Sequence, residues 1–216
     1  IKFLLRYTYP KADKILVNSK TSQEEFKEIN IKSQIVYSGS IKNLKKKKKI
    51  KRKNLFNIIA VGRLTYQKDY FTLLDAIEKL KKKNFILRIY GDGELKNELT
   101  SYIYKKNLQK NVKLHGHEKN NERIYSRADL LIHTAIFEGL PNVVVEAMNH
   151  EVPVIASNGF GGTKEALNNG KFGELFYPGD STGLSKKINN FLLNPNKLKK
   201  KVIKSKPFFL KMTLWK

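Results

Sequence analysis

Short apolar segments alternate with helical patterns along the chain from residue 56 onward. Strands are expected at 56–61, 85–90, 112–115, 129–133, 152–156 and 173–176, the first of them an apolar run (FNIIAV) typical of a buried parallel strand. Helices are expected at 70–83, 94–106, 121–127, 142–149, 163–168 and 182–193. This alternation predicts an α/β fold with a doubly wound parallel sheet, whose strand order the pattern does not reveal.

The first 40 residues carry a shorter version of the same pattern. Strands are expected at 14–19 and 34–38, and a helix at 21–29 that begins with Ser19 or Thr21 as its cap. A lysine-rich stretch then marks a linker, because packed like charges repel each other. The predicted division is a small N-terminal part at 1–40, a basic linker at 41–54, a Rossmann-like domain at 55–195 and a basic tail at 196–216.

Composition narrows the class of protein. Of the 216 residues 40% are hydrophobic, which is enough for a core. There is no cysteine, which excludes a disulfide framework and any zinc–cysteine site. No apolar run approaches the ~20 residues of a membrane-spanning helix. We therefore expect a cytoplasmic protein that is soluble or bound peripherally to the membrane.

The net charge of +24 is unevenly distributed along the chain. Residues 42–53 hold nine basic residues and no acid, and residues 181–216 hold ten and no acid. Residues 54–180 are nearly balanced, with 17 basic and 15 acidic residues. We favour a solvated, compositionally biased surface over an anionic membrane surface, and nucleic acid is the least favoured partner. In the membrane interpretation the residues that would insert are Phe208, Phe209, Leu210 and Trp215.

The first segment with candidate chemistry follows the strand expected at 56–61. It contains Gly62, Arg63 and Lys68, and a helix follows it. Loops at the carboxyl ends of parallel strands face the ligand crevice of an open α/β sheet. A guanidinium and an ammonium there suit a diphosphate. The alternative is an ordinary loop with surface charges.

The second segment carries two carboxylates, Glu138 and Glu146, separated by seven residues. Glu138 follows the strand expected at 129–133, and Glu146 lies in the next helix. The start of that helix offers N–H groups to an anion or a sugar hydroxyl. The apolar run 143–145 indicates that Glu146 lies among buried side chains and needs a partner. The alternative is a solvent-facing Glu146 and a capping Glu138.

Two weaker candidates remain. A glycine-rich loop at 159–165 again follows a strand and opens a helix, so it could cradle a phosphate, although a plain turn with Thr163 as helix cap is the favoured interpretation. His115 and His117 flank a turn and match no zinc motif. Because the three loops all follow strands, we expect them to line one crevice.

Together these motifs resemble the C-terminal domain of glycosyltransferase family 4, whose members are retaining enzymes of the two-domain GT-B fold. The resemblance runs from residue 12 to residue 194 and is carried, in the family's order, by ADKILVNS, VGRLTYQKDYFTLLDAI, IYGDGELKNEL, NVKLHGH, ADLLIHTAIFEGLPNVVVEAM, VPVIAS, GGTKEAL and GELFYPGD. It implies that 55–195 bind a nucleotide sugar. It also implies that 1–40 are the remnant of an acceptor domain that is otherwise largely missing.

The resemblance also implies residue roles. Arg63 and Lys68 would hold the donor diphosphate, Glu138 would contact the transferred sugar, and Glu146 would bind the ribose hydroxyls. These first three are the catalytic candidates, because fixed cations stabilise charge on the leaving phosphate. The complete set of donor-binding residues implied is Gly62, Arg63, Lys68, Gly116, His117, Glu138, Gly139, Leu140 and Glu146.

The implied activity is transfer of a sugar from a nucleoside-diphosphate sugar to a glycan or lipid-linked acceptor, in cell-surface polysaccharide or lipopolysaccharide assembly. The nucleotide sugar is a substrate, so no cofactor and no metal site are expected. The alternatives are a donor-binding module that does not transfer, inactive as this fragment, and a basic protein that binds membranes or nucleic acid.

Overall fold

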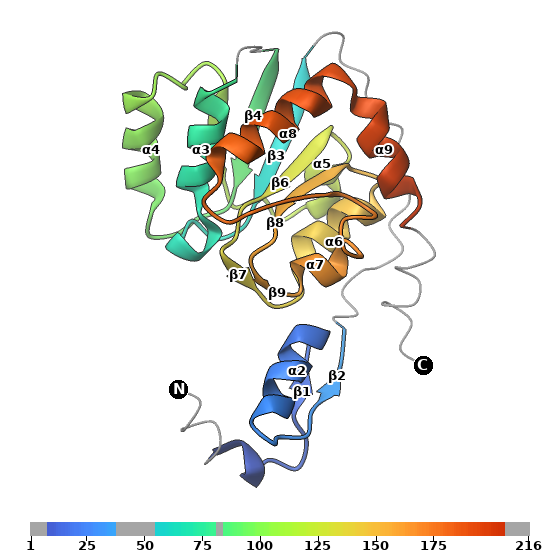
Figure 1. Ribbon diagram of the computed structural model, residues 1–216. Coiled ribbons are helices and arrows are strands. Elements are labelled where there is room, and N and C mark those ends of the chain that lie inside the picture. Colours follow the sequence, from blue (N-terminus) through green and yellow to red (C-terminus); the bar gives the residue numbers. More distant parts are fainter. Residues whose placement is uncertain (1–7, 38–54, 81–83, 206–216) are drawn as a thin grey trace.

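The structure is a computed structural model that describes residues 8–37, 55–80 and 84–205 (Figure 1). Its centre is a six-stranded parallel sheet of order β10-β8-β6-β3-β4-β5. The strands are β3 (Phe56–Val61), β4 (Phe85–Tyr90), β5 (Val112–Gly116), β6 (Leu130–His133), β8 (Val154–Ser157) and β10 (Glu174–Phe176). All six expected strands form, and the predicted parallel α/β sheet is confirmed.

Helices cover both faces of this sheet (Figure 1). One face carries α3 (Tyr70–Glu78), α4 (Lys96–Lys105) and α8 (Ser181–Leu193), and the other carries α5 (Asn121–Tyr125), α6 (Asn142–Asn149) and α7 (Thr163–Ala166). Neighbouring residues of one strand therefore enter different cores: Ile58 packs with α3 and α8, whereas Ile59 packs with α6. Full burial of each such side chain stabilises the fold by about 1.5–3 kcal/mol.

The strand order creates a switch point in the middle of the sheet. From β3 the chain moves outward through β4 to β5, and from β6 it moves the other way through β8 to β10. The connections that leave β3 and β6 therefore diverge, although the two strands are neighbours. In open α/β sheets a crevice for ligands forms at this point, outside the carboxyl ends of the strands.

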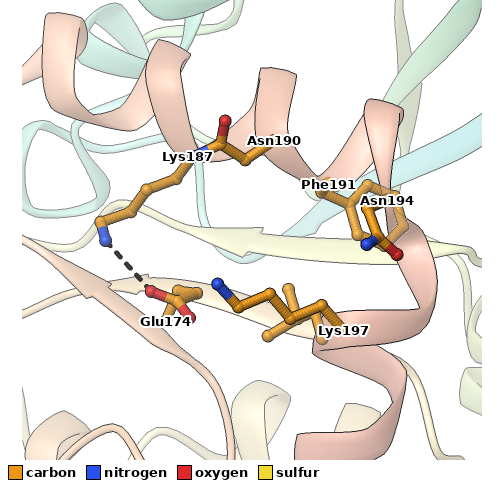
Figure 2. Close-up of a pocket in the computed structure, with 7 residues that line it drawn as sticks. Glu174, Lys187, Asn190, Phe191, Asn194 and Lys197 are labelled. Carbon is orange, nitrogen blue, oxygen red and sulfur yellow. Dashed lines mark hydrogen bonds and ion pairs between the residues drawn. The ribbon is translucent and has the colours of Figure 1, made fainter.

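The C-terminal tail expected from residue 196 is partly a helix. Residues Pro195–Ile203 form α9, whose Leu198 and Val202 are buried. Lys201 donates to Glu174 Oε1 at 2.6 Å. Lys187 of α8 donates to the other carboxylate oxygen at 3.1 Å, the bond that Figure 2 shows as a dashed line. Burial alone would raise the pKa of Glu174, but these hydrogen bonds outweigh it and hold the pKa below its ordinary value. The charge count suggested a solvated tail because this acidic partner lies far away in the sequence.

Other predicted segments need shorter comment. The helix expected at 70–83 ends at Glu78. The basic linker at 41–54 and the tail residues Phe208, Phe209, Leu210 and Trp215 lie outside the described residues. None of the helices in the described ranges is long and apolar enough to cross a membrane.

The N-terminal part contributes a small unit of its own (Figure 1). It consists of η1 (Tyr9–Lys11), β1 (Leu16–Val17), α2 (Lys20–Glu28) and β2 (Gln34–Ile35), with β1 and β2 paired in parallel. Ser19 caps α2, since its side chain accepts a hydrogen bond from the N–H of Ser22 at 3.1 Å. Glu165 of α7 ties this unit to the sheet domain: it accepts from Lys20 N at 2.7 Å and from Tyr37 OH at 2.5 Å.

The turn after β4 allows us to predict a stability change. Gly91 has φ +147°, and a Cβ there would lie 1.9 Å from the carbonyl oxygen of Gly62. We expect Gly91→Ala to lower the free energy of unfolding by about 3 kcal/mol or more, because backbone cannot yield as a side chain does. Urea denaturation measures the change.

Gly179→Ala is the matched control, because Gly179 also has a positive φ, +75°, but its Cβ would meet no atom within 4 Å. Backbone strain alone should cost about 1–2 kcal/mol there. Equal losses in the two variants would show that the approach of Gly91 to Gly62 is unimportant.

Candidate functional site

A cation and a carboxylate meet at the switch point of the sheet. Lys68 ends the short helix η2 (Tyr66–Lys68) after β3, and Glu138 ends β7 (Phe137–Glu138) after β6. The Lys68 ammonium forms an ion pair with Glu138 Oε2, and the two side chains are only 12% and 21% exposed. The structure thus joins two residues that the sequence placed on separate loops. Their partial burial strengthens the pairing relative to a pair in water.

Hydrogen bonds link the loop after β3 to the loop after β6. Ile136 N donates to Gln67 O at 2.9 Å, and Gln67 Nε2 donates to Phe137 O at 2.8 Å. The Thr134 hydroxyl donates to Lys68 O at 2.6 Å. Because three bonds cross between the loops, Lys68 and Glu138 are held in place before any ligand arrives. Such preorganisation is what lets a fixed charge act on a reacting group.

The third predicted loop supports Glu138 and does not stand open as a phosphate cradle. Its strand β9 (Phe160–Gly161) pairs in parallel with β7. Gly162 N donates to Glu138 O at 3.1 Å, and Phe160 N donates to Ile136 O at 3.0 Å. These N–H groups are therefore occupied by the neighbouring loop. Thr163 is not the helix cap either, since Gly162 holds that position.

His133 is a residue of this site that the sequence analysis did not single out. It ends β6, is 3% exposed, and places Nε2 3.7 Å from Glu138 Oε2. Among the described residues this nitrogen has no hydrogen-bond partner. Burial, with the Lys68 charge as a smaller cause, lowers its pKa to about 3, so the imidazole is neutral at pH 7. A polar residue at the carboxyl end of an apolar strand was the signal in the sequence.

Arg63 lines a separate cavity across the ends of β3, β4 and β5. This cavity has a volume of about 340 Å³, within the range of small-molecule sites. It is lined by Val61, Gly62, Arg63, Tyr90, Gly91, Asp92, His117, Glu118, Asn121 and Ile124. The structure therefore brings together the predicted Gly62, Arg63 and His117. Gly116 lies beside the cavity, where its carbonyl accepts from Gly91 N at 2.8 Å.

Glu146 lies on α6 and has the polar partners that its apolar surroundings require. Tyr125 OH donates to Glu146 Oε2 at 2.8 Å, and Asn121 Nδ2 lies 3.3 Å from both carboxylate oxygens. Burial raises the pKa of Glu146, and these two hydrogen bonds oppose the rise. Asn121 also lines the Arg63 cavity. The carboxylate therefore stands directly behind one wall of the cavity.

The last two predicted residues differ in what they offer. Leu140 is 7% exposed and packs with the α6 core, so its backbone is the part left for a ligand. Gly139 lies against the N-terminal unit, where a Cβ would come within 2.7 Å of the Asn18 side chain. Asn18 thus reaches the Glu138 loop from a distant part of the chain. Nothing in its sequence context indicated this contact.

The six-stranded sheet and the charged crevice at its switch point define an α/β domain of the kind found in GT-B glycosyltransferases. Residues 40–207 match the family model of the group 1 glycosyl transferases, and the chain belongs to this family.

Relatives in sequence are longer than this chain. An uncharacterized glycosyltransferase of Methanocaldococcus jannaschii is 36% identical over 177 residues, which cover 75% of this chain and 44% of the relative. A Campylobacter jejuni enzyme, N-acetylgalactosamine-N,N'-diacetylbacillosaminyl-diphospho-undecaprenol 4-alpha-N-acetylgalactosaminyltransferase, is 31% identical over 206 residues, which cover 92% of this chain and 56% of that enzyme. The chain thus spans about half of each.

Solved structures share the fold. Anabaena HepE in complex with UDP-glucose superposes with a TM-score of 0.80 at 25% identity, over 94% of this chain and 62% of that chain. The lipopolysaccharide outer core galactosyltransferase WaaB gives a TM-score of 0.74 at 22% identity, over 88% of this chain and 57% of that chain. At 22% identity, the similarity to WaaB shows a shared fold and nothing more.

The buried histidine predicts a pH dependence of stability. The pKa of His133 is about 3 in the folded chain and 6.5 ordinarily, so the unfolded chain binds a proton more readily. The contribution of neutral His133 is complete above pH 6.5 and is lost as the pH falls towards 3, at up to about 1.4 kcal/mol per pH unit.

Urea denaturation between pH 7 and pH 4 tests this expectation. The variant His133→Gln keeps a polar side chain that does not titrate, so its unfolding free energy should fall less steeply than that of the wild type. If the unfolding free energies of the two proteins fall in parallel with pH, His133 is protonated in the folded chain without cost and is not enclosed as described.

Proposed function

We propose that this chain is the donor-binding half of a retaining glycosyltransferase of family 4. It would transfer a sugar from a nucleoside-diphosphate sugar to a glycan or lipid-linked acceptor. The observation that carries the proposal is the Lys68–Glu138 pair, held at the switch point beside the Arg63 cavity. Membership of the group 1 glycosyltransferases supports the reaction class.

The two cations suit the chemistry of the leaving group. When the bond between sugar and phosphate breaks, negative charge builds on the nucleoside diphosphate. Arg63, exposed at the cavity, offers a planar fork that binds phosphate through two hydrogen bonds. Lys68 offers a point charge that Glu138 already holds in position. Losing one fixed donor of this kind raises a barrier by about 2.7–4 kcal/mol.

We propose that Glu138 binds the transferred sugar. Its Oε2 is bound by Lys68 and lies near His133, and carboxylate lone pairs beyond these contacts can accept from sugar hydroxyls. The neutral imidazole does not compete with Lys68 for the negative charge. Glu146 is proposed to bind the ribose, directly or through Asn121, which lines the cavity. The two carboxylates would thus hold different parts of one donor.

The acceptor class is inferred from what relatives of this chain are named for. The Campylobacter jejuni relative is named for transfer to a diphospho-undecaprenol-linked sugar. Another relative, 33% identical over 133 residues, is named for capsular polysaccharide biosynthesis in Staphylococcus aureus. We therefore propose a glycan or lipid-linked acceptor in cell-surface polysaccharide assembly. An acceptor of this kind would bring the enzyme to the cytoplasmic face of a membrane.

Two single variants separate the phosphate contacts from the rest of the site. Arg63→Ala and Lys68→Ala should each weaken UDP binding by roughly tenfold to a hundredfold, because each removes charge-assisted bonds to phosphate. Uridine binding should stay unchanged. Calorimetric titration is performed with a chelator present, because we expect binding without a divalent metal.

Lys110→Ala is the control, since Lys110 is exposed in the turn after α4. Arg63→Ala gives the cleaner result, because Arg63 is exposed, whereas Lys68→Ala leaves Glu138 without its partner. Equal losses for UDP and uridine would show that the loop only maintains the fold. Binding that requires magnesium or manganese would contradict the expected mode.

The reaction itself is tested with the complete protein that contains these residues. Incubation with a UDP-sugar and an undecaprenyl-diphosphate-linked acceptor should give a product with the anomeric configuration of the donor, as judged by NMR. Glu138→Gln should lower the rate by about 10²–10³-fold, because it removes the carboxylate charge that we propose to act on the sugar and to position Lys68. An inverted product would refute the retaining assignment. UDP binding without any transfer would indicate a donor-binding module.

A further inference from the structure

Arginine is rare in this chain, and the arginines of the described ranges lie close to two neighbouring pockets. The 43 basic residues comprise 37 lysines and six arginines. Four of the arginines lie in the described ranges: Arg63, Arg88, Arg123 and Arg127. Arg63 lines the cavity described above, and the other three line a second pocket beside it. A lysine would supply the same charge, so their presence indicates a need for the planar donor fork that only a guanidinium has.

The second pocket lies on the α5 side of the sheet, over β4 and β5. Alternate residues of β4 are buried, while Arg88 and Tyr90 on its other face are half-buried. The corresponding residues of β5, Lys113 and His115, are exposed. The pocket has a volume of about 200 Å³ and is lined by the three arginines with Asn57, His115 and Glu118 among their neighbours. Polar groups therefore form most of this surface.

Buried Asn57 fixes the base of the pocket. Its Oδ1 accepts a hydrogen bond from Arg88, and its Nδ2 donates to the backbone oxygen of Arg127 at 2.6 Å. Asn57 is 8% exposed, and its own N–H donates to Asp129. One side chain thus positions the guanidinium of Arg88 and the backbone of Arg127. Most of the five N–H donors of each guanidinium remain available for a ligand.

The pocket carries an excess of positive charge. Glu118 is the one carboxylate among the described lining residues, and its Oε2 lies 3.8 Å from Arg123 Nη1. Neither Arg88 nor Arg127 forms an ion pair with a residue of the described ranges. His115 stacks on Tyr90 with ring centroids 5.0 Å apart. Partial loss of solvent around the ring, followed by the charges of Arg88 and Lys113, lowers the pKa of His115, so this ring adds no charge at neutral pH.

We propose that this arginine pocket, formed by Arg88, Arg123 and Arg127, binds a phosphate group of its own. The pocket adjoins the Arg63 cavity, with which it shares the lining residues Tyr90, Glu118 and Ile124. The three guanidinium groups around this pocket can donate paired hydrogen bonds to the oxygens of a phosphate. The volume suits a phosphate or a headgroup of that size. The phosphate comes from a free anion or from a lipid headgroup at the membrane surface. This inference goes beyond the proposed transferase function and does not depend on it.

The test uses the whole chain, inorganic phosphate as the probe, and saturating UDP to fill the Arg63 cavity. Calorimetry should detect phosphate binding under these conditions. The double variant Arg123→Gln/Arg127→Gln should weaken it by about tenfold or more, and Arg123→Lys/Arg127→Lys should weaken it too, because it keeps the charge but loses the forks. Both arginines are exposed, so neither double variant should unfold the chain.

The control Lys105→Gln/Lys110→Gln removes the same charge from α4 and the turn after it, on the opposite face of the sheet (Figure 1). It should leave phosphate affinity within about twofold of the wild type, because distant exposed charges are screened by salt. If the control loses as much phosphate affinity as the glutamine variant, the effect is one of general positive charge and the proposal fails. The same holds if the lysine variant binds phosphate like the wild type. Displacement of phosphate by UDP would place the anion in the Arg63 cavity and overturn the proposal.

Vesicles identify the source of the phosphate. Sedimentation compares phosphatidylcholine vesicles that contain about one fifth phosphatidic acid with vesicles that contain the same fraction of phosphatidylserine. A preference for phosphatidic acid that the glutamine variant abolishes assigns a lipid headgroup. Binding of inorganic phosphate that depends on the arginines, without this preference, assigns a free anion. If neither probe depends on the arginines, the pocket is not a phosphate site. UDP affinity, measured on the same variants, reports separately on the donor site.

Discussion

The half-buried ion pair between Lys68 and Glu138 is the contact on which the crevice depends. It links the loop after β3 to the loop after β6, two connections that the strand order sends in opposite directions. Without the pair each group would lose its partner in a partly desolvated place, which is costly for a charge. The hydrogen bonds of Gln67 and Thr134 and the pairing of β7 with β9 hold the same two loops. The pair is therefore fixed by backbone as well as by charge.

This arrangement places two cations near one another at one edge of the sheet, where we propose that the donor diphosphate binds. Arg63 and Lys68 lie at either end of one short loop, so a donor can meet a guanidinium at the cavity and an ammonium at the switch point. His133 lies beside Glu138 as a neutral ring and adds no charge to the site. The second pocket extends positive charge along the α5 side of β4 and β5. One half of the sheet edge thus carries the cations of both anion sites that we propose.

The loops that follow strands were well predicted, and their internal contacts were not. Arg63, Lys68 and Glu138 could be proposed as site residues because cations and a carboxylate after apolar strands are visible in the sequence. His133 and Asn18 were missed, since their importance comes from neighbours at distant positions in the chain. For the glycine-rich loop at 159–165 the sequence favoured a plain turn over a phosphate cradle, and its Phe160 and Gly162 N–H groups bond to the Glu138 loop. Of the lysines after residue 196, Lys197, Lys200 and Lys204 are exposed, whereas Lys201 binds Glu174, a partner that the charge count did not reveal.

The sequence alone determined the class of fold, the position of every main strand, and the charges that the ligand crevice would offer. These follow from local pattern, because burial of alternate or continuous apolar residues requires the same spacing in any protein. Only the tertiary structure decided the strand order, and with it which loops become neighbours. It also decided that Glu146 is held by Tyr125 and Asn121, and that three of the few arginines share one pocket. Such contacts join residues far apart in the chain, and their free energy depends on a geometry that no single segment encodes.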